Sequence, residues 1–230
     1  MSDLLTMSET VSAFFYGTLL HPSILRRVIG HDGAQLEICP ALLLEHTRHK
    51  IKYADYPGVI PYTKSRTLFS RELTPEERTV RGTVVTGLKL HDIDLLDIFE
   101  GREYTRQSIS VHPLGSFTSL ESAAAYSAVP MTSPLLPPLD ALPGPLSAQT
   151  YIWARPLTEL TPELWEYADF VRDNAWKWVG DGSRNNADYA EVDRRRAMNG
   201  NIVSTETVST DSEDHRKTVM ETFDEGTVQA

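Results

Sequence analysis

Short apolar runs separated by turn-forming residues dominate the chain as far as residue 154. Residues 11–16 form an apolar and aromatic run that ends at Gly17, a pattern that predicts a buried strand. Further runs rich in β-branched or aromatic residues have the length of strands. These five predicted strands comprise residues 41–44, 50–53, 80–86, 108–112 and 150–154.

Three segments show the apolar spacing of amphipathic helices. The first begins at Pro22, which suits a first helical position, and ends at Gly30. The second covers residues 92–100, and the third runs from Thr161, as N-cap, to residue 178. Because strands outnumber helices and do not alternate regularly with them, the pattern favours an α+β domain built around a small barrel over a doubly wound sheet.

Two segments depart from this regular pattern. Residues 115–148 concentrate proline, which removes backbone donors, and we interpret them as an insertion whose leucines pack locally. Residues 181–230 are polar and acidic, and we expect this C-terminal tail to be partly disordered. The predicted organisation is an N-terminal extension over residues 1–12, a folded domain over residues 13–180 and the tail.

Deletion of residues 201–230 should leave the melting temperature and the turnover of the domain nearly unchanged. Seven acidic and two basic residues give this stretch a net charge of −5, half of the −10 of the whole chain. Its scattered apolar side chains bury too little surface to offset an ordering cost of roughly 1–2 kcal/mol per residue. Thermal unfolding of the truncated protein tests this expectation, and a melting temperature several degrees lower would show that the tail docks on the domain.

Composition excludes several classes of function. A net charge of −10 disfavours nucleic acid, whose phosphates require clustered lysine and arginine. The sequence has no apolar run of the roughly 18–20 residues that a membrane-spanning helix needs, and residues 1–10 lack the basic and apolar regions of a secretory signal. We therefore expect a cytoplasmic protein without membrane contact. The single cysteine, Cys39, forms no internal disulfide, and the sequence offers no zinc-type cluster.

The first candidate for chemistry is the segment Tyr16-Gly17-Thr18-Leu19, where a predicted strand turns into a helix. Glycine permits close approach of the backbone to a ligand, and we expect Gly17 to adopt a left-handed conformation. Backbone N–H groups ahead of a helix attract carboxylate or phosphate. An ordinary strand-to-helix turn has the same sequence pattern.

The second candidate is Glu100, the last residue of a predicted helix, preceded by Phe99 and followed by Gly101. The negative end of the helix dipole and the apolar neighbour both disfavour a charged carboxylate, which suits a general acid or base near neutral pH. Spacing alone favours a solvated acid, or one paired with Arg102 or Arg106, over a catalytic role.

Together these segments resemble a known family. Tyr16-Gly17-Thr18-Leu19, then Asp55-Tyr56-Pro57-Gly58-Val59-Ile60-Pro61, and then Leu96-Asp97-Ile98-Phe99-Glu100-Gly101 with Tyr104 and Arg106 are similar, in this order, to the motifs of the gamma-glutamylcyclotransferase-like superfamily. The Tyr-Gly-Thr-Leu variant resembles the plant avirulence-induced-gene-like and gamma-glutamylamine cyclotransferase branch.

The resemblance implies a small mixed β-barrel with flanking helices and an enzyme that needs no cofactor or metal. It implies that Glu100 is the catalytic acid and base, and that a γ-glutamyl substrate cyclises to 5-oxoproline as its amine leaves. The implied substrate-binding residues are Tyr16, Gly17, Thr18, Leu19 and Tyr104. An alternative from another class is a non-catalytic binding or interaction module that keeps the same pocket, although such a module has no need of an acid at Glu100.

Other residues invite weaker interpretations. Glu103 lies near Glu100 but lacks the family match, and Cys39 is expected to be a small buried group and not a nucleophile. His46 and His49 with Asp55 lack further metal ligands, so we expect them to be polar surface residues. Core packing is expected for three tryptophans, Trp165, Trp176 and Trp178. The basic run at residues 194–196 is expected to be a solvated face.

Overall fold

A closed barrel forms the centre of the computed structural model, which describes residues 10–129 and 135–173. Five strands follow one another in the order β5-β1-β8-β6-β2, and a further pairing of β2 with β5 closes the ring. The β1–β8 pair is parallel and the other four pairs are antiparallel, which confirms the mixed barrel. The barrel strands are β1 (Val11–Phe15), β2 (Glu37–Leu44), β5 (Thr79–Leu88), β6 (Tyr104–Pro113) and β8 (Leu146–Trp153).

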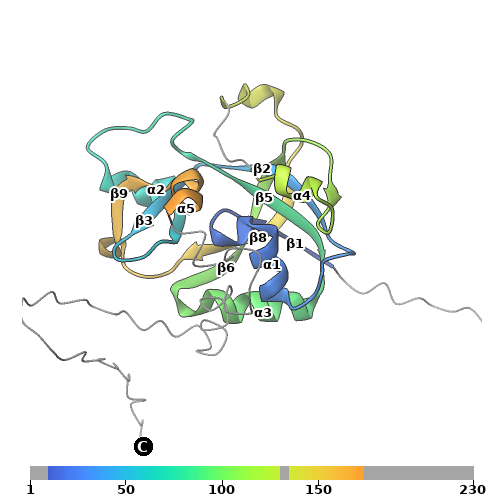
Figure 1. Ribbon diagram of the computed structural model, residues 1–230. Helices are drawn as coiled ribbons and strands as arrows, with labels where there is room; N and C mark the ends of the chain where they lie inside the picture. The colour runs from blue at the N-terminus through green and yellow to red at the C-terminus, as the bar shows by residue number, and fades with distance from the viewer. Residues whose placement is uncertain (1–9, 130–134, 174–230) are drawn as a thin grey trace, which may run out of the picture.

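A smaller sheet stands beside the barrel, at the left of Figure 1. It has the order β4-β3-β9 and contains β3 (His46–Ile51), β4 (Pro57–Pro61) and β9 (Leu160–Leu164). The short helices α2 (Tyr62–Ser65) and α5 (Tyr167–Asp173) lie at the same side of the molecule (Figure 1). This sheet brings Tyr56 of the β3–β4 loop and Pro57, the first residue of β4, to the pocket described below.

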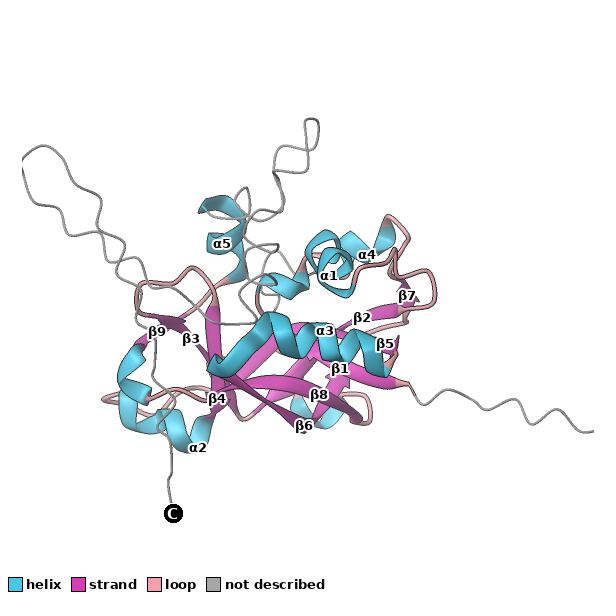
Figure 2. Ribbon diagram, turned by 90° about the horizontal axis from the view of Figure 1, so that it is seen from below, coloured by secondary structure: helices cyan, strands magenta, loops and turns pink. Residues whose placement is uncertain are grey.

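Two helices flank the barrel and confirm the predictions for residues 22–30 and 92–100. In α1 (Pro22–Ile29), Pro22 occupies the first position and Gly30 ends the helix with a left-handed φ of 78°. In α3 (Leu90–Glu100), the Asp92 carboxylate accepts the Lys89 N–H at 2.8 Å and so closes the first turn. Figure 2 shows α3 lying across the barrel strands, with α1 beside it.

Side chains alternate between the two faces of a strand, so the neighbouring residues Phe14 and Phe15 of β1 pack in different hydrophobic clusters. Phe15 packs in the larger cluster with Leu20 of the following turn, Ile24 of α1 and Leu96 of α3. Phe14 packs in the second cluster with side chains of the other barrel strands: Cys39, Val84, Val111 and Ile152. Both faces of β1 are therefore buried, which fixes the position of the turn that follows it.

The C-terminal helix predicted from Thr161 is wrong in its first part. Residues 160–164 form strand β9, which pairs with β3 through Ile51 and His49, and the helix begins only at Tyr167. Proline is tolerated at the edge of a sheet, so Pro162 is compatible with this strand as well as with a helix start. The pairing with β3, a long-range contact, decides between them. Residues 174–178 of the predicted helix lie outside the described residues.

One strand prediction needed correction, and one strand was not predicted. The strand predicted at residues 50–53 is β3, which begins earlier at His46 and ends at Ile51, before Tyr53 with its positive φ of 64°. Strand β4 was missed because its two prolines argue against a strand, but Pro57 and Pro61 are its end residues.

The described part of the proline-rich insertion packs on the domain. Strand β7 (Thr118–Ser119) pairs with β2, and helix α4 (Ala124–Ser127) docks on α1. The Tyr126 hydroxyl accepts a hydrogen bond from the Arg26 guanidinium at 2.8 Å, and Leu120 and Ala125 are fully buried. Within its described part, the insertion contributes no residue to the pocket described below.

Candidate active site

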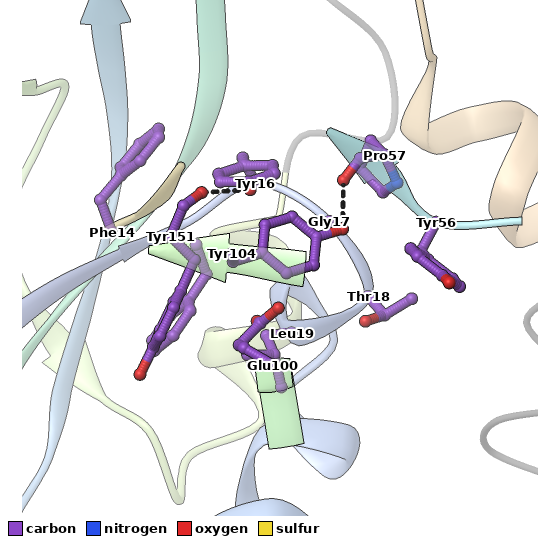
Figure 3. A pocket seen from close by; sticks show the side chains of 11 residues that line it. Phe14, Tyr16, Gly17, Thr18, Leu19, Tyr56, Pro57, Glu100, Tyr104 and Tyr151 are labelled. Atoms are coloured by element: carbon purple, nitrogen blue, oxygen red, sulfur yellow. Dashed lines mark hydrogen bonds between the residues drawn. The ribbon is translucent and has the colours of Figure 1, made fainter. Parts of the chain in front are cut away.

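A hollow of about 350 Å³, open to solvent, lies where the β1–α1 turn meets the end of α3 (Figure 3). The structure brings all six residues named by the sequence analysis to it: Tyr16, Gly17, Thr18, Leu19, Glu100 and Tyr104. Its other lining residues are Phe14, Phe15, Tyr56, Pro57 and Tyr151.

The turn after β1 forms one wall of the pocket. Strand β1 ends at Phe15, and a single 3-10 turn (Thr18–Leu20) leads into α1. The Gly17 carbonyl accepts the Leu20 N–H at 3.0 Å, and the Thr18 and Leu19 side chains are buried. Buried anchors on both sides therefore hold the backbone of this turn in place.

The left-handed conformation expected at Gly17 is wrong, because its φ is −120°. Glycine is required at this position because a side chain would have too little room. A Cβ built on Gly17 would lie 3.1 Å from both Cδ and Cγ of Pro57, which is tighter than most such contacts. Glycine thus allows the turn to pack directly against the opposite pocket wall.

The end of α3 supplies the carboxylate of the pocket. Glu100 is the last residue of the helix, and Figure 3 shows its side chain pointing toward the ring of Tyr104. The chain leaves the helix through Gly101, with φ 65° and ψ −155°, into the single 3-10 turn Gly101–Glu103. This backbone conformation is restricted to glycine, so Gly101 determines how the helix stops beside the pocket.

Replacement of Gly101 by alanine should destabilise the fold by roughly 1–3 kcal/mol, the usual cost of forcing a side chain into such a conformation. Chemical denaturation measures the loss. Gly115→Ala is the control, since no atom lies within 4 Å of a Cβ at that position and its φ is not positive. Equal stability of the two variants would contradict this role of Gly101.

Three tyrosine hydroxyls hold the pocket together. The buried Tyr16 hydroxyl donates a short hydrogen bond to the Tyr151 carbonyl, and the Tyr104 hydroxyl donates to the Pro57 carbonyl at 2.9 Å. The Tyr151 hydroxyl donates to the Asp97 carboxylate at 2.8 Å, one helical turn before Glu100. These bonds link β8 to the end of β1 and to α3, and they link β6 to β4, around the site.

Burial raises the pKa of all three hydroxyls well above 10, and the nearby negative charge of Glu100 raises each further. They stay protonated as donors at neutral pH. Because their folded pKa lies above the unfolded one, they contribute stability below pH 10 that is lost as the pH rises beyond 10.

Alkaline titration checks this effect. We expect the absorbance of ionised Tyr16, Tyr104 and Tyr151 to appear only together with unfolding, and stability to fall above pH 10. The Tyr104→Phe variant should show one fewer of these late-titrating groups. Ionisation of all tyrosines near pH 10 in the folded state would contradict the buried network.

Sequence reasoning missed three prominent lining residues. Tyr56 and Pro57 lie in the Asp-Tyr-Pro-Gly segment that carried the resemblance, so the motif itself was an available signal. Tyr151 lies in the middle of strand β8, where an aromatic residue is typical of any strand. Its place in the pocket follows from the pairing of β8 with β1 and β6.

The remaining candidates stay outside the pocket lining. Glu103 follows in the turn after Glu100, and its carboxylate accepts a hydrogen bond from the Tyr56 hydroxyl at 3.4 Å. Cys39 is fully buried, as predicted. Trp165 is buried too and packs on Phe170, which confirms its core role.

His49 was wrongly expected at the surface. It is fully buried, and its ring nitrogens hydrogen-bond to the Thr161 carbonyl and the Thr47 hydroxyl, both at 2.8 Å. His46 is only half-buried. Among the described residues, no three His, Cys, Asp or Glu side chains are grouped so as to hold a metal ion. Trp176, Trp178 and residues 194–196 lie outside the described part of the chain.

Within residues 10–129 and 135–173, no helix combines the length and the apolar character needed to span a membrane.

Comparison with known proteins agrees with the motifs in this pocket. A model of the family described as gamma-glutamyl cyclotransferase, AIG2-like, matches residues 13–176, more than half of the chain. The chain belongs to this family. Among curated proteins, the family resemblance extends to Protein AIG2 C of Arabidopsis thaliana, which is 24% identical over 103 residues, 45% of this chain and 53% of that protein. The chain thus spans about half the length of this relative.

Solved structures from two organisms are similar to the structure of this chain. One is a solution structure of an Arabidopsis thaliana protein, with a TM-score of 0.43, 19% identity and coverage of 76% of this chain and 88% of that one. Another is a crystal structure of a yeast gamma-glutamyl cyclotransferase specific to glutathione, with a TM-score of 0.40, 15% identity and coverage of 82% and 87%.

Proposed function

We propose that this protein is a γ-glutamyl cyclotransferase, which converts a γ-glutamyl amide to 5-oxoproline and releases the amine. One observation carries the proposal: the carboxylate of Glu100 and the Tyr16–Leu19 turn, far apart in the sequence, line the same pocket in a chain of this family.

The proposed reaction needs a single proton carrier. The Glu100 carboxylate takes a proton from the neutral α-amino group of the substrate as its nitrogen attacks the γ-carbonyl carbon of the same molecule. A carbon–nitrogen bond forms and closes the five-membered ring. The bond to the leaving nitrogen then breaks as Glu100 returns the proton to that nitrogen, so the enzyme ends in its starting state.

The rest of the pocket acts by orientation. Closing a ring within one molecule needs the amine and the carbonyl held within reach, and such positioning alone supplies several kcal/mol of the barrier reduction in model reactions. In this proposal the turn amides from Gly17 to Leu19 bind the glutamyl portion, and the rings of Tyr16 and Tyr104 pack around it. The Tyr16 and Tyr104 hydroxyls donate to main-chain carbonyls, and we assign the proton transfer to the carboxylate of Glu100.

A screen of γ-glutamyl compounds with the purified full chain tests the proposal. γ-Glutamyl amino acids, γ-glutamylamines and glutathione are incubated with the protein, and 5-oxoproline is measured in each case. We expect release from at least one class. Binding of these compounds without any 5-oxoproline would instead indicate the binding-module alternative.

A further inference from the structure

A buried arginine on β3 makes direct contact with the turn of the pocket. The Nη1 atom of Arg48 donates to the Tyr16 carbonyl at 2.9 Å and to the Arg81 carbonyl at 3.2 Å, while its Nε donates to the Trp165 carbonyl at 3.0 Å. Its side chain is only 10% exposed. One guanidinium group thus joins the ends of β1, β5 and β9, which only the forked geometry of arginine permits.

Arg48 remains charged in this place. Burial lowers its pKa to about 10, still far above neutral pH, and Glu166 at 3.8 Å counteracts part of that effect. The guanidinium also lies over the Trp165 ring, 4.8 Å from its centre. The three carbonyls, the ring and the carboxylate together compensate for a burial that would otherwise be costly.

The bond to Tyr16 fixes one peptide group in the pocket wall. The described residues contain no cis peptide bond, so the Tyr16 carbonyl and the Gly17 N–H point in opposite directions from their shared plane. Arg48 holds the carbonyl on the interior side. The Gly17 N–H is then turned to the other side, and Gly17 lines the pocket.

We propose that Arg48 is a positioning residue for catalysis: by holding the Tyr16 carbonyl, it presents the Gly17 N–H to an oxygen of the bound glutamyl group. The inference rests on the proposed function for the identity of that group. It assigns no contact between Arg48 and the substrate, since the arginine acts through the Tyr16–Gly17 peptide. It also explains why the turn keeps one orientation although Gly17 itself is conformationally permissive.

Three variants of the full chain test this role. Arg48→Met removes all three hydrogen bonds, and Arg48→Lys keeps the charge but loses the fork. Arg81→Met is the matched control, because Arg81 is equally buried, with a side chain 7% exposed, but its guanidinium pairs with Glu76 at 2.6 Å. Each variant is measured in two ways: the amide resonance and hydrogen exchange of Gly17 without ligand, and KM and kcat on the γ-glutamyl compound that gives most 5-oxoproline.

We expect both Arg48 variants to shift the Gly17 amide resonance and speed its exchange. KM should rise about tenfold or more for Arg48→Met, because one hydrogen bond to a charged group is lost. The change in kcat should be smaller, and Arg48→Lys should restore KM in part. Arg81→Met should lower stability but leave the Gly17 amide and KM near wild type.

An unchanged Gly17 amide in a folded Arg48 variant would overturn the proposal, as would an unchanged KM. If neither Arg48 variant folds while Arg81→Met does, Arg48 serves stability and the proposal is also overturned. The amide measurement needs no substrate. It therefore decides the role of Arg48 in orienting Gly17 even if no γ-glutamyl compound is turned over, an outcome that would refute only the proposed function.

Discussion

Replacement of Glu100 by glutamine should reduce 5-oxoproline formation by on the order of 100-fold or more, the usual contribution of a general acid or base. The amide has the size of the carboxylate but cannot carry a proton between the two nitrogens of the substrate. The substitution keeps the shape of the side chain at the end of α3, so the melting temperature and the binding of 5-oxoproline should change little. Steady-state kinetics and thermal unfolding of the same preparation separate the two effects.

Glu103→Gln is the control for this experiment. Glu103 lies three residues beyond Glu100, in the 3-10 turn that follows α3, and is not a lining residue of the pocket. Its carboxylate accepts a hydrogen bond from Tyr56, a bond that the amide oxygen of glutamine can also accept. We therefore expect mild effects on KM and kcat. Near wild-type activity of Glu100→Gln with a loss in Glu103→Gln would transfer the catalytic role to Glu103.

Replacement of Gly17 by valine should raise KM or the dissociation constant of 5-oxoproline by about 10- to 100-fold. A Cβ at this position would already be 3.1 Å from two ring carbons of Pro57, and the methyl groups of valine add to the overlap. Pro57 begins strand β4 and its carbonyl accepts the Tyr104 hydroxyl, so the ring cannot move without deforming the pocket. Overpacking of this kind costs typically 1–3 kcal/mol.

Gly115→Val is the control for Gly17→Val, because a Cβ at Gly115 meets no atom within 4 Å. Isothermal titration with 5-oxoproline gives the dissociation constant, and thermal unfolding gives the stability of each variant. We expect the Gly17 variant to lose affinity together with the roughly 1–3 kcal/mol of stability that overpacking costs, and Gly115→Val to keep both. Unchanged affinity would show that the turn only connects β1 to α1.

Much of the fold followed from local signals in the sequence. Buried runs such as residues 11–16 and 80–86 predicted β1 and β5, and the glycines after α1 and α3 marked both helix ends. These elements were predictable because propensity, apolar spacing and capping agree in each of them.

The errors arose where tertiary contacts override local preference. Thr161 and Pro162 read as a helix start, but pairing with β3 makes them part of a strand. His49 has the polarity of a surface residue, yet two hydrogen bonds satisfy its ring nitrogens in the core. Neither partner is visible from spacing along the chain.

In the candidate site, too, some residues were predicted from sequence motifs and others were not. Glu100 and the Tyr16–Leu19 turn were named from motifs, and the barrel brings them together. Tyr151 and Arg48 were missed, because an aromatic residue and an arginine within strands carry no local signal of function. The role proposed for Arg48 depends on the Tyr16 carbonyl, 32 residues away in the sequence.

The most direct test of the central claim follows the α-nitrogen of the substrate. A γ-glutamyl compound with an isotopic label on this nitrogen is incubated with the enzyme, and the products are analysed by mass spectrometry. If the α-amine attacks its own γ-carbonyl, all of the label appears in the ring of 5-oxoproline and none in the released amine, and Glu100→Gln forms little of either product. Release of labelled glutamate in place of 5-oxoproline would show hydrolysis by water and would contradict the cyclotransferase account.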